Sequence, residues 1–445
     1  MIGLGLGPAF GGAFNWAAYW ATLISATVED AAPTKVVMTF SKANTNLVAS
    51  DFTIAGKTVT LLERDVTNKI LTLTVSVAFK YGDTPVITFG KTGETADVTN
   101  NVLFAFATAS ADLTQSYVVK LPIGKTLTID WDDGNIIDYA GNNLVNVTVA
   151  HNYAGAGTYN IKFSGDFLSL THLSCYSNSL TGNISSWSVL TNLIYLRCDT
   201  NSLEGDVSSW SSLTNLTYLL CDNNSLEGNV SGWSALTSLT KLTCYGNSLE
   251  GDVSGWSSLT NLTTLTCSSN SLEGDVSGWS VLTNLIYLRC DGNSLEGDVS
   301  SWSSLIRLNT LQCYNNSLTG DVSSWSALTI LTYLRCNNNS LTGDVSSWSA
   351  LTILTYLQCY NNSLDFDSSA AWTALNLGLN CDFSSNSMST TQVNNALIAF
   401  AGGPFTNTTI DLSSNTGPRD SDSDAAVATL ITAGCTIITN GGTEP

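Results

Sequence analysis

The sequence of 445 residues predicts a mainly β fold, in which two β-sandwich modules precede a curved repeat solenoid and a helical cap closes the C-terminal end. The solenoid is predicted by a cysteine that returns every 23 residues from Cys175 to Cys359, since a fixed period of this size is typical of stacked repeats. The sandwiches are predicted by short apolar segments, broken by Asn, Asp and Gly, over residues 29–166. The cap is predicted by two helix signals beyond residue 387.

One turn of the repeat, from Leu193 to Asn215, reads L-x-x-L-x-C-x-x-N-S-L-x-G-D-V-S-S-W-S-x-L-x-x. The alternation of Leu193, Leu196 and Cys198 with polar residues predicts a short strand with one buried face. Strands of successive turns stack about 4.8 Å apart, so each position becomes a ladder of like residues. The asparagine three residues behind each cysteine can then bond the backbone of the bends, whose buried N–H and C=O groups need partners.

Nine of the 11 cysteines occupy this inward strand position. Parallel side chains on neighbouring strands match the geometry of a disulfide poorly. We therefore expect buried thiols that pack as small hydrophobic groups, which fits a chain that folds in a reducing cytoplasm.

This unit resembles the leucine-rich repeat, whose consensus is L-x-x-L-x-L-x-x-N-x-L-x-G, with Cys in place of the third Leu. The resemblance recurs nine times in register within residues 167–387. The sequence departs from the plant-type form, which has Ile-Pro and then Leu, at Val207, Ser208 and Trp210. The resemblance implies a curved leucine-rich-repeat solenoid with its short strands on the concave side.

The chain begins with residues 1–28, which are uncharged and rich in glycine. They lack the Lys or Arg that opens a signal peptide, and they are too Gly-rich at their start for a membrane span. We interpret them as a docking segment that binds other subunits of a larger assembly. A leader that packs on the next domain and an atypical export signal are the alternatives.

Residues 29–107 are predicted to form a β-sandwich, with strands at Lys35–Phe40, Phe52–Ile54, Thr58–Leu62, Ile70–Val77 and Pro85–Phe89. The motifs Val36–Ser41, Asp51–Ile54 and Tyr81–Asp83 resemble those of bacterial Ig-like modules, which implies a spacer.

Residues 108–166 carry Ile129–Gly134, then His151–Tyr153 and Gly157–Ile161, and this pattern is similar to the polycystic-kidney-disease-type (PKD-type) Ig-like domain. Its position indicates that this second sandwich also caps the first repeat. Its three aspartates beside His151 allow a metal or acid–base site, but Asp-Gly is itself a turn signal, so we favour turn carboxylates.

Residues 388–445 are predicted to contain irregular repeats and the cap, because Asn386 and Asn415 repeat the spacing from strand to asparagine. Ser389–Gln392 forms a capping box that opens one helix. A second helix is expected from about Asp424 to Ala433, stopped by Gly434, before a last strand at Thr436–Thr439. For Asp420, Asp422 and Asp424 we favour helix capping over calcium binding.

Composition excludes several function classes. The net charge of -20 disfavours a nucleic-acid partner, and we expect no membrane insertion. The only histidines are His151 and His172, and no nucleophile elbow, P-loop, H-E-x-x-H or Cys-x-x-Cys motif is present, so we expect no enzyme activity. The acids Glu204 and Asp206 recur turn after turn, which indicates a framework position, and we expect no cofactor, with calcium on these acidic columns as the alternative.

Three strand positions vary while their neighbours stay nearly fixed: the residue before the second Leu, the residue before Cys and the residue after it. On a repeat stack these columns form the concave face, the usual binding surface of such folds. Tyr and Arg carry much of the binding energy at interfaces, although exposed strands favour Tyr, Thr and Arg anyway. The predicted ligand-binding residues are Tyr176, Tyr195, Arg197, Asp199, Tyr218, Asp222, Lys241, Tyr245, Tyr287, Arg289, Asp291, Gln312, Tyr314, Tyr333, Arg335, Tyr356, Gln358 and Tyr360.

These features predict a non-enzymatic recognition protein whose concave face binds a cell-surface glycan or protein. The order of modules resembles bacteriophage tail, fibre or capsid-appendage proteins, which implies a virion component assembled in the host cytoplasm. The alternatives are a secreted or surface adhesin of bacteria, located outside the cell, and a purely structural virion protein. A polysaccharide-degrading enzyme is the least favoured, because it needs an acid pair off the repeat register.

Overall fold

The structure is a computed structural model that describes residues 114–142, 146–155, 157–372 and 380–443, the side chain of Asn380 apart. Among the first 113 residues it describes only the backbone of the strands β1 to β9. The chain divides into two compact units, one of Met1–Ala105 with Lys162–Ser164 and one of the remaining residues. No helix within these described parts is long and apolar enough to cross a bilayer.

The first unit contains a five-stranded sheet in the order β4-β5-β2-β1-β8 and a three-stranded sheet in the order β3-β6-β7. The strands are β1 (Leu23–Val28), β2 (Lys35–Phe40), β3 (Phe52–Ile54), β4 (Val59–Arg64), β5 (Ile70–Val75), β6 (Val86–Phe89), β7 (Thr95–Asp97) and β8 (Thr99–Asn100). Strands β2 to β6 lie where the sequence predicts strands, whereas β1 falls inside the segment assigned to docking. Residues 1–22 of that segment lie outside the described residues, and the Ig-like fold stays a prediction.

The second unit opens with strands that continue both sheets of the solenoid. They are β9 (Phe104–Ser110), β10 (Thr114–Lys120), β11 (Thr126–Asp130), β12 (Ile136–Ala140), β13 (Val147–Asn152) and β14 (Thr158–Gly165), followed by the 3₁₀-helix η3 (Phe167–Ser169). β10 pairs antiparallel with the first repeat strand, and β9 pairs antiparallel with the first strand of the other solenoid sheet. The PKD-type fold of this segment stays a prediction.

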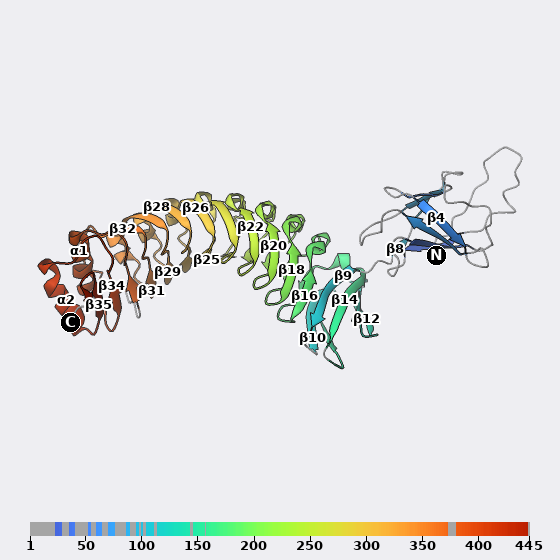
Figure 1. Cartoon of the computed structure of the whole chain (residues 1–445), viewed down its shortest axis with the longest axis horizontal. Helices are drawn as coiled ribbons and strands as arrows, with labels where there is room; N and C mark the ends of the chain where they lie inside the picture. Colours follow the sequence, from blue (N-terminus) through green and yellow to red (C-terminus); the bar gives the residue numbers. More distant parts are fainter. Residues whose placement is uncertain are drawn as a thin grey trace, which may run out of the picture. The chain divides into compact units, whose positions relative to one another are not determined.

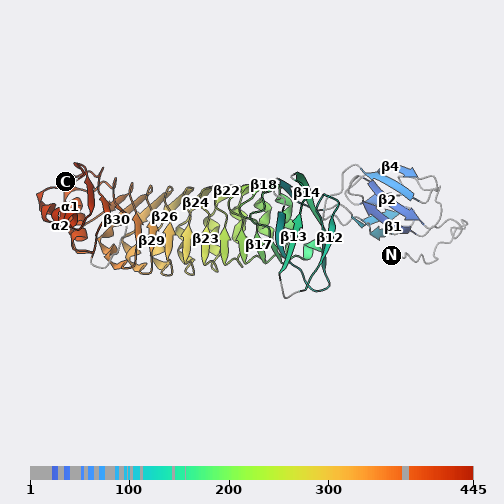
Figure 2. The same cartoon turned by 90° about the horizontal axis from the view of Figure 1, so that it is seen from below.

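The solenoid forms an arc in which one strand of each turn lies on the inner side (Figure 1). These inner strands follow β13 and β10 in a 15-stranded sheet and run parallel from β15 to β35. Figure 2 shows them side by side. They are β15 (His172–Ser174), β17 (Tyr195–Arg197), β19 (Tyr218–Leu220), β21 (Lys241–Thr243), β23 (Thr264–Thr266), β25 (Tyr287–Arg289), β27 (Thr310–Gln312), β29 (Tyr333–Arg335), β31 (Tyr356–Gln358), β33 (Asn380–Asp382), β34 (Thr409–Asp411) and β35 (Thr436–Thr439), with the antiparallel β36 (Gly442–Thr443) at the edge. We call β15 to β31 the concave sheet.

A second parallel sheet, which the sequence analysis did not predict, lies on the outer side of the arc (Figure 1). It belongs to a 13-stranded sheet and contains β16 (Leu180–Asn183), β18 (Ser202–Asp206), β20 (Ser225–Asn229), β22 (Ser248–Asp252), β24 (Ser271–Asp275), β26 (Ser294–Asp298), β28 (Ser317–Asp321), β30 (Ser340–Asp344) and β32 (Ser363–Asp365). We call these strands the convex sheet.

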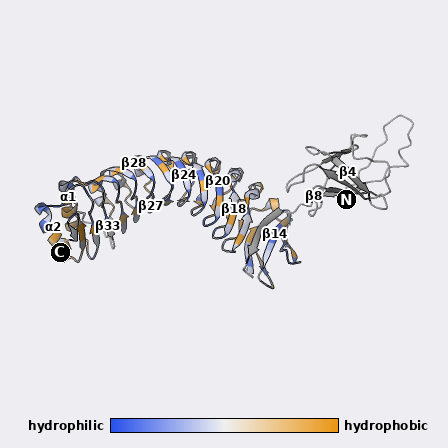
Figure 3. Cartoon of the chain, in the orientation of Figure 1, coloured by the Kyte–Doolittle hydropathy of each residue, from blue (hydrophilic) through white to orange (hydrophobic). Residues whose placement is uncertain are grey.

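A short 3₁₀-helix closes each turn and carries its tryptophan into the core. These helices are η4 (Ser185–Val189), η5 (Ser208–Ser212), η6 (Ser231–Ala235), η7 (Ser254–Ser258), η8 (Ser277–Val281), η9 (Ser300–Ser304), η10 (Ser323–Ala327) and η11 (Val345–Ala350). The Leu, Cys, Val and Trp positions of the repeat are completely buried. Hydrophobic and hydrophilic residues therefore alternate within each turn of the arc (Figure 3).

The C-terminal end follows the sequence prediction closely. Helix α1 (Thr390–Ala401) begins at the capping box, in which Ser389 and Gln392 each bond the other's backbone N–H. The 3₁₀-helix η12 (Ser421–Ser423) leads into α2 (Asp424–Thr432), which ends just before Gly434. The carboxylate of Asp420 accepts a hydrogen bond from the backbone N–H of Asp422, as expected of a capping residue.

Candidate binding face

The concave sheet holds successive turns in strict register, so the variable residues form columns. Residues 23 positions apart pair directly, as Tyr195 does with Tyr218. The next residues along the two strands, Leu196 and Leu219, also pair, and both are completely buried. We name the outward columns after their commonest residues. The tyrosine column is His172, Tyr195, Tyr218, Lys241, Thr264, Tyr287, Thr310, Tyr333 and Tyr356, and the arginine column is Ser174, Arg197, Leu220, Thr243, Thr266, Arg289, Gln312, Arg335 and Gln358.

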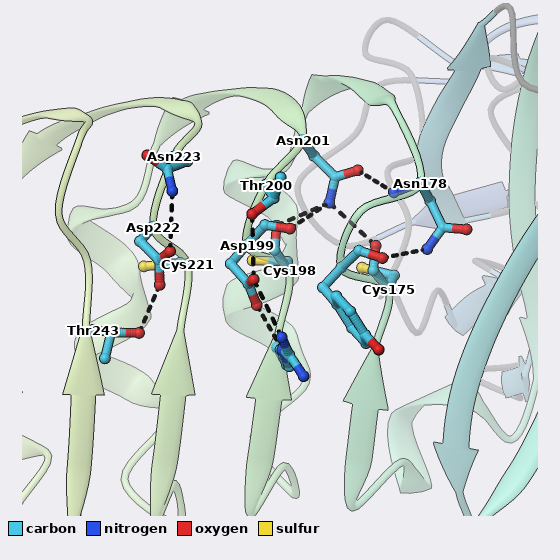
Figure 4. A network of polar contacts seen from close by, with 12 residues as sticks. Cys175, Asn178, Cys198, Asp199, Thr200, Asn201, Cys221, Asp222, Asn223 and Thr243 are labelled. Atoms are coloured by element: carbon cyan, nitrogen blue, oxygen red, sulfur yellow. Dashed lines mark hydrogen bonds and ion pairs between the residues drawn. The ribbon is translucent and has the colours of Figure 1, made fainter.

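The asparagine ladder fixes the bend that follows each concave strand. The Asn201 amide donates to the carbonyls of Cys175 and Cys198, at 3.1 and 3.0 Å, and its Oδ1 accepts from the backbone N–H of Asn178 at 3.0 Å (Figure 4). The same Oδ1 accepts from the backbone N–H of Leu180 at 2.9 Å. Equivalent bonds recur from Asn224 to Asn362. Because the framework bonds to itself in this way, the outward side chains are free to vary.

The aromatic side chains gather at two places along the tyrosine column. Near its start, the Tyr195 ring centroid lies 5.8 Å from that of His172 and 5.6 Å from that of Tyr218. Near its end, the rings of Tyr333 and Tyr356 are parallel within 2° and their centroids lie 4.3 Å apart. Of the predicted residues, Tyr218 and Tyr176 are the exposed ones, at 41% and 42%, and the other column tyrosines are half-buried against their neighbours.

The arginine column carries the positive charge of this face. Arg197 Nε donates to Asp199 Oδ1 at 2.7 Å, and Arg289 Nε donates to Asp291 Oδ1 at 3.0 Å. The hydrogen bond to Asp199 raises the pKa of Arg197 further above its ordinary value. The guanidinium carbons of Arg197 and Arg335 also lie over the rings of Tyr176 and Tyr314, at 3.5 and 3.9 Å from the centroids. Cation and ring attract each other in this geometry.

Three predicted ligand-binding aspartates are not outward residues. Asp199, Asp222 and Asp291 are buried. The concave strand ends before the cysteine, so the residue after Cys lies in the bend and need not follow the alternation of the strand. Asp199 and Asp291 bond their arginines, and Asp222 accepts from Thr243 Oγ1 at 2.7 Å (Figure 4). Burial, and then the neighbouring Asp199, raise the pKa of Asp222.

The remaining predicted residues lie on the concave face as half-buried side chains. Lys241 belongs to the tyrosine column, Gln312 and Gln358 belong to the arginine column, and Tyr245, Tyr314 and Tyr360 follow their cysteines. Tyr245 Oη accepts a hydrogen bond from the Asn223 amide at 3.0 Å, which ties two neighbouring turns together. These residues therefore lie on one face, and of all the predicted ligand-binding residues only the three aspartates are buried.

The acidic positions of the convex sheet line up with a shift of two residues, so that an aspartate of one turn lies opposite a glutamate of the next. In this register Glu204 lies opposite Ser225 and Asp206 opposite Glu227. Asp206 Oδ1 accepts from the backbone N–H of Ser208 at 2.8 Å, and hydrogen bonds from Ser208 lower the pKa of Asp206. In the described ranges no three His, Cys, Asp or Glu side chains meet as a metal site. The aspartates at this position therefore serve the framework, by accepting from the backbone of the bend that follows.

The histidine near the start of the second unit also has a framework position. His151 is buried, stacks on Trp131 with 4.7 Å between ring centroids, and its Nε2 lies 2.8 Å from Asp133 Oδ2. Burial raises the pKa of Asp133, but hydrogen bonds from His151 and Asn135 outweigh it and leave that pKa lowered. This packing agrees with the interpretation of the aspartates as turn carboxylates.

Two of the residues that follow the repeat cysteines, Ser268 and Asn337, are not among the predicted ligand-binding residues, and Asn337 stands out in the structure. It is buried, and neither its amide nitrogen nor its oxygen has a hydrogen-bond partner among the described residues. The signal was present in the sequence, since Y-L-R-C is followed by Asp at Asp199 and Asp291 and by Asn at this turn alone.

Comparison of the sequence with models of protein families and with curated proteins finds no match. Solved structures do match. The leucine-rich-repeat ectodomain of the plant membrane receptor kinase GASSHO1/SCHENGEN3 from Arabidopsis thaliana is 28% identical over 56% of this chain and 33% of that chain, with a TM-score of 0.45. A functional domain of InlJ from Listeria monocytogenes, which includes a cysteine ladder, is 30% identical over 57% of this chain and 51% of that chain, with a TM-score of 0.42.

An internalin, inlF, from Listeria monocytogenes is 22% identical over 61% of this chain and 86% of that chain, with a TM-score of 0.37. This chain spans 33% to 46% of the length of four receptor chains among the matches. By its own geometry, with 23-residue turns, short concave strands and an asparagine ladder, the repeat region fits a leucine-rich-repeat solenoid.

Proposed function

We propose that this chain is a non-enzymatic recognition protein whose concave face binds a glycan or a protein on a cell surface. The observation that carries the proposal is the contrast between the repeat positions that stay fixed and the outward columns that vary. The Leu, Cys, Asn and Trp positions stay fixed and are buried or hydrogen-bonded within the solenoid. The tyrosine and arginine columns vary from turn to turn and face outward.

The chemistry of these columns supports recognition. Tyr and Arg are enriched among the residues that dominate interface energies. A tyrosine offers an apolar ring and a polar hydroxyl together, which suits sugar rings as well as protein surfaces. Two aromatic clusters, at His172–Tyr195–Tyr218 and at Tyr333–Tyr356, present such rings at separate places along the face.

We further propose that the protein is a component of a bacteriophage virion and that residues 1–28 bind other virion subunits. All cysteines from Cys175 to Cys359 are free, buried thiols, which supports folding in a reducing compartment such as the host cytoplasm. Fractionation of purified particles tests this part: the chain should sediment with virions, and recovery only from the bacterial surface would favour an adhesin.

The binding proposal is tested on a panel of bacterial cells and surface glycans. The decisive variant carries Ala in place of Tyr195, Tyr218, Tyr287, Tyr333 and Tyr356. Because a few anchors supply most of an interface's energy, we expect its binding to weaken at least about a hundredfold. The matched control carries Ala in place of five exposed convex glutamates, Glu204, Glu227, Glu250, Glu273 and Glu296, and should bind as the parent does.

Thermal unfolding of both variants shows whether each is folded. If the folded tyrosine variant and the parent bind equally, or if the parent binds nothing in the panel, the concave face is not the receptor site. A structural role in the virion then becomes the better account.

A further inference from the structure

Two turns of the solenoid carry nearly the same arrangement and differ in one functional group. Arg197 lies over Tyr176 and bonds Asp199, two residues further along. Arg335 lies over Tyr314 in the same way, but the residue two positions further along is Asn337. Arg289 is paired like Arg197, with Asp291. Arg335 is therefore the arginine of this column that lacks the aspartate of the other two.

The groups around Arg335 share a lack of partners within the described residues. Arg335 makes no ion pair there, and its Nε is buried without a hydrogen-bond partner. The residue Asn337 is 1% exposed, and both its side-chain amide nitrogen and its side-chain oxygen are without partners. Gln358, paired with Arg335 on the next strand, has a buried Oε1 that is also without one.

Unsatisfied buried groups of this kind are costly, and folded proteins carry few of them. The chain satisfies the same positions elsewhere, with Asp199 and Asp291 on their arginines. The cluster also lies beside the stacked pair of Tyr333 and Tyr356, whose ring centroids are 4.3 Å apart. The arginine that lacks an aspartate partner, Arg335, thus lies at one of the two aromatic clusters of the concave face.

We propose that Arg335, Asn337 and Gln358 form a binding site for a sugar that carries a carboxylate. This inference rests on the proposed function and specifies the ligand of one part of the concave face. The guanidinium of Arg335 takes the carboxylate, in the role that Asp199 and Asp291 fill for the other two arginines. The Asn337 and Gln358 side chains exchange hydrogen bonds with hydroxyl groups, and the tyrosine pair contacts the ring.

The compactness of the cluster favours a sugar over an acidic peptide. Its polar groups come from two neighbouring turns, whose strands lie about 4.8 Å apart, and a sugar ring carries a carboxylate and several hydroxyl groups within such a span. The net charge of -20 repels an anion, so the attraction must come from the local cation. Recognition should then depend sharply on Arg335.

The test titrates the full-length protein with an oligomer of glucuronic acid, with a glucose oligomer as the uncharged match and a glutamate peptide as the acidic non-sugar. Asn337→Asp is designed to rebuild the pair seen at Arg197–Asp199, and Arg335→Gln removes the cation. We expect the parent to bind the acidic sugar at least about tenfold more tightly than the neutral one, and both variants to lose that preference.

A gain-of-function variant is available in the same chain. Asp291→Asn frees Arg289 beside Gln312 and so repeats the polar groups of the site, without the stacked tyrosines. It should add a second, weaker site for the acidic sugar. If no second site appears, a freed arginine does not suffice for recognition, and the assignment is overturned.

The assignment is also overturned if Asn337→Asp binds the acidic sugar as the parent does, or if the parent binds the glucose oligomer or the glutamate peptide equally well. The five-tyrosine variant separates this failure from that of the broader proposal. If no sugar binds but cells do, and the tyrosine variant loses the cells, the concave face remains the receptor site and only the acidic-sugar site fails.

Discussion

Each asparagine of the ladder holds the backbone of two neighbouring turns. The Asn270 amide donates to the carbonyls of Cys244, Cys267 and Ser268 at 3.0, 3.1 and 3.2 Å, and its Oδ1 accepts from the backbone N–H of Leu249 at 3.0 Å. A single side chain thus satisfies backbone groups that no strand pairing reaches. We expect these residues to be among the most sensitive polar positions in the chain.

Replacing Asn270 by Ala should lower the free energy of unfolding by roughly 2–4 kcal/mol, because buried carbonyls and an N–H lose their partners. Denaturant unfolding measures the change. The matched variant is Asn261→Ala, which removes one exposed bond, to the Thr237 carbonyl at 3.0 Å, and should cost less than about 1 kcal/mol. Equal losses in the two variants would contradict the role of the ladder.

The buried carboxylate of Asp222 should make stability depend on pH. Its pKa is raised by burial and by Asp199, so the folded chain prefers the protonated form, and this contribution to stability is lost as pH rises through the folded-state pKa. Asp222→Asn keeps an acceptor for Thr243 and removes the charge. Its melting temperature should exceed that of the parent at pH 7, and the difference should vanish below about pH 4. A lower melting temperature at pH 7 would contradict this account.

The inward ladders could be predicted residue by residue, whereas the post-cysteine column could not. Strand alternation identifies Leu196 and Cys198 as inward, and both are completely buried. The same alternation places Asp199 outward, but the strand has already ended at Arg197. The direction of the Asp199 side chain in the bend depends on contacts with the neighbouring repeat. The local sequence pattern holds no information about those contacts.

At the scale of elements, the 3₁₀-helices stack their tryptophans into a continuous column. The ring centroids of Trp256 and Trp279 lie 6.3 Å apart, those of Trp279 and Trp302 lie 6.2 Å apart, and the rings are nearly parallel. Trp279 Nε1 also donates to the Val253 carbonyl of the preceding turn at 3.2 Å. The convex side is therefore held by ring packing and, from Trp233 to Trp348, by one indole hydrogen bond in each turn.

Trp279→Ala should cost roughly 3–5 kcal/mol of unfolding free energy, since it leaves a large cavity between two turns. Trp279→Phe keeps most of the apolar packing and should cost less than half as much. Thermal and denaturant unfolding of the two variants make the comparison. An alanine variant as stable as the phenylalanine variant would show that the column contributes little.

The convex sheet could not be predicted from local propensity, because Gly and Asp are poor strand residues. The sheet forms because a glycine in each convex strand from β18 to β30 lets the aspartate or asparagine side chain of the preceding turn pack closely against its backbone. Gly228 has φ +106°, and a Cβ on it would collide with the Asp206 carboxylate of the preceding turn. The S-L-x-G-D segment is thus a strand only when stacked. The capping box at Ser389, in contrast, is a local signal, and it predicted the start of α1 correctly.

At the scale of the second unit, the open ends of the ladder are closed by other segments. At one end, Asn178 Oδ1 accepts from the backbone N–H of Ser116 in β10 at 2.8 Å, and Gln115 Nε2 donates to the Asn178 carbonyl at 3.2 Å. At the other end, the Asn440 amide donates to the Asn415 carbonyl. A solenoid needs such caps because a terminal turn has a neighbour on one side only.

The burial of the thiols makes a prediction for the whole chain. All 11 cysteines are free and buried, and burial raises the pKa of the thiols in the cysteine column, which suppresses the reactive thiolate. A thiol reagent should label the native protein slowly and should reach 11 thiols in guanidinium without any reductant. A count below 11 in the denatured, unreduced protein would show that disulfides have formed.

The central claim, that the concave face is the recognition surface, is tested most directly by side-chain footprinting. Tyrosine oxidation is mapped by mass spectrometry with and without a cell-surface preparation that the protein binds. The account predicts protection of Tyr195, Tyr218, Tyr333 and Tyr356, while Tyr139 and Tyr159, in the strands before the solenoid, react unchanged. Protection of Tyr139 and Tyr159 with no change in the concave tyrosines would contradict it.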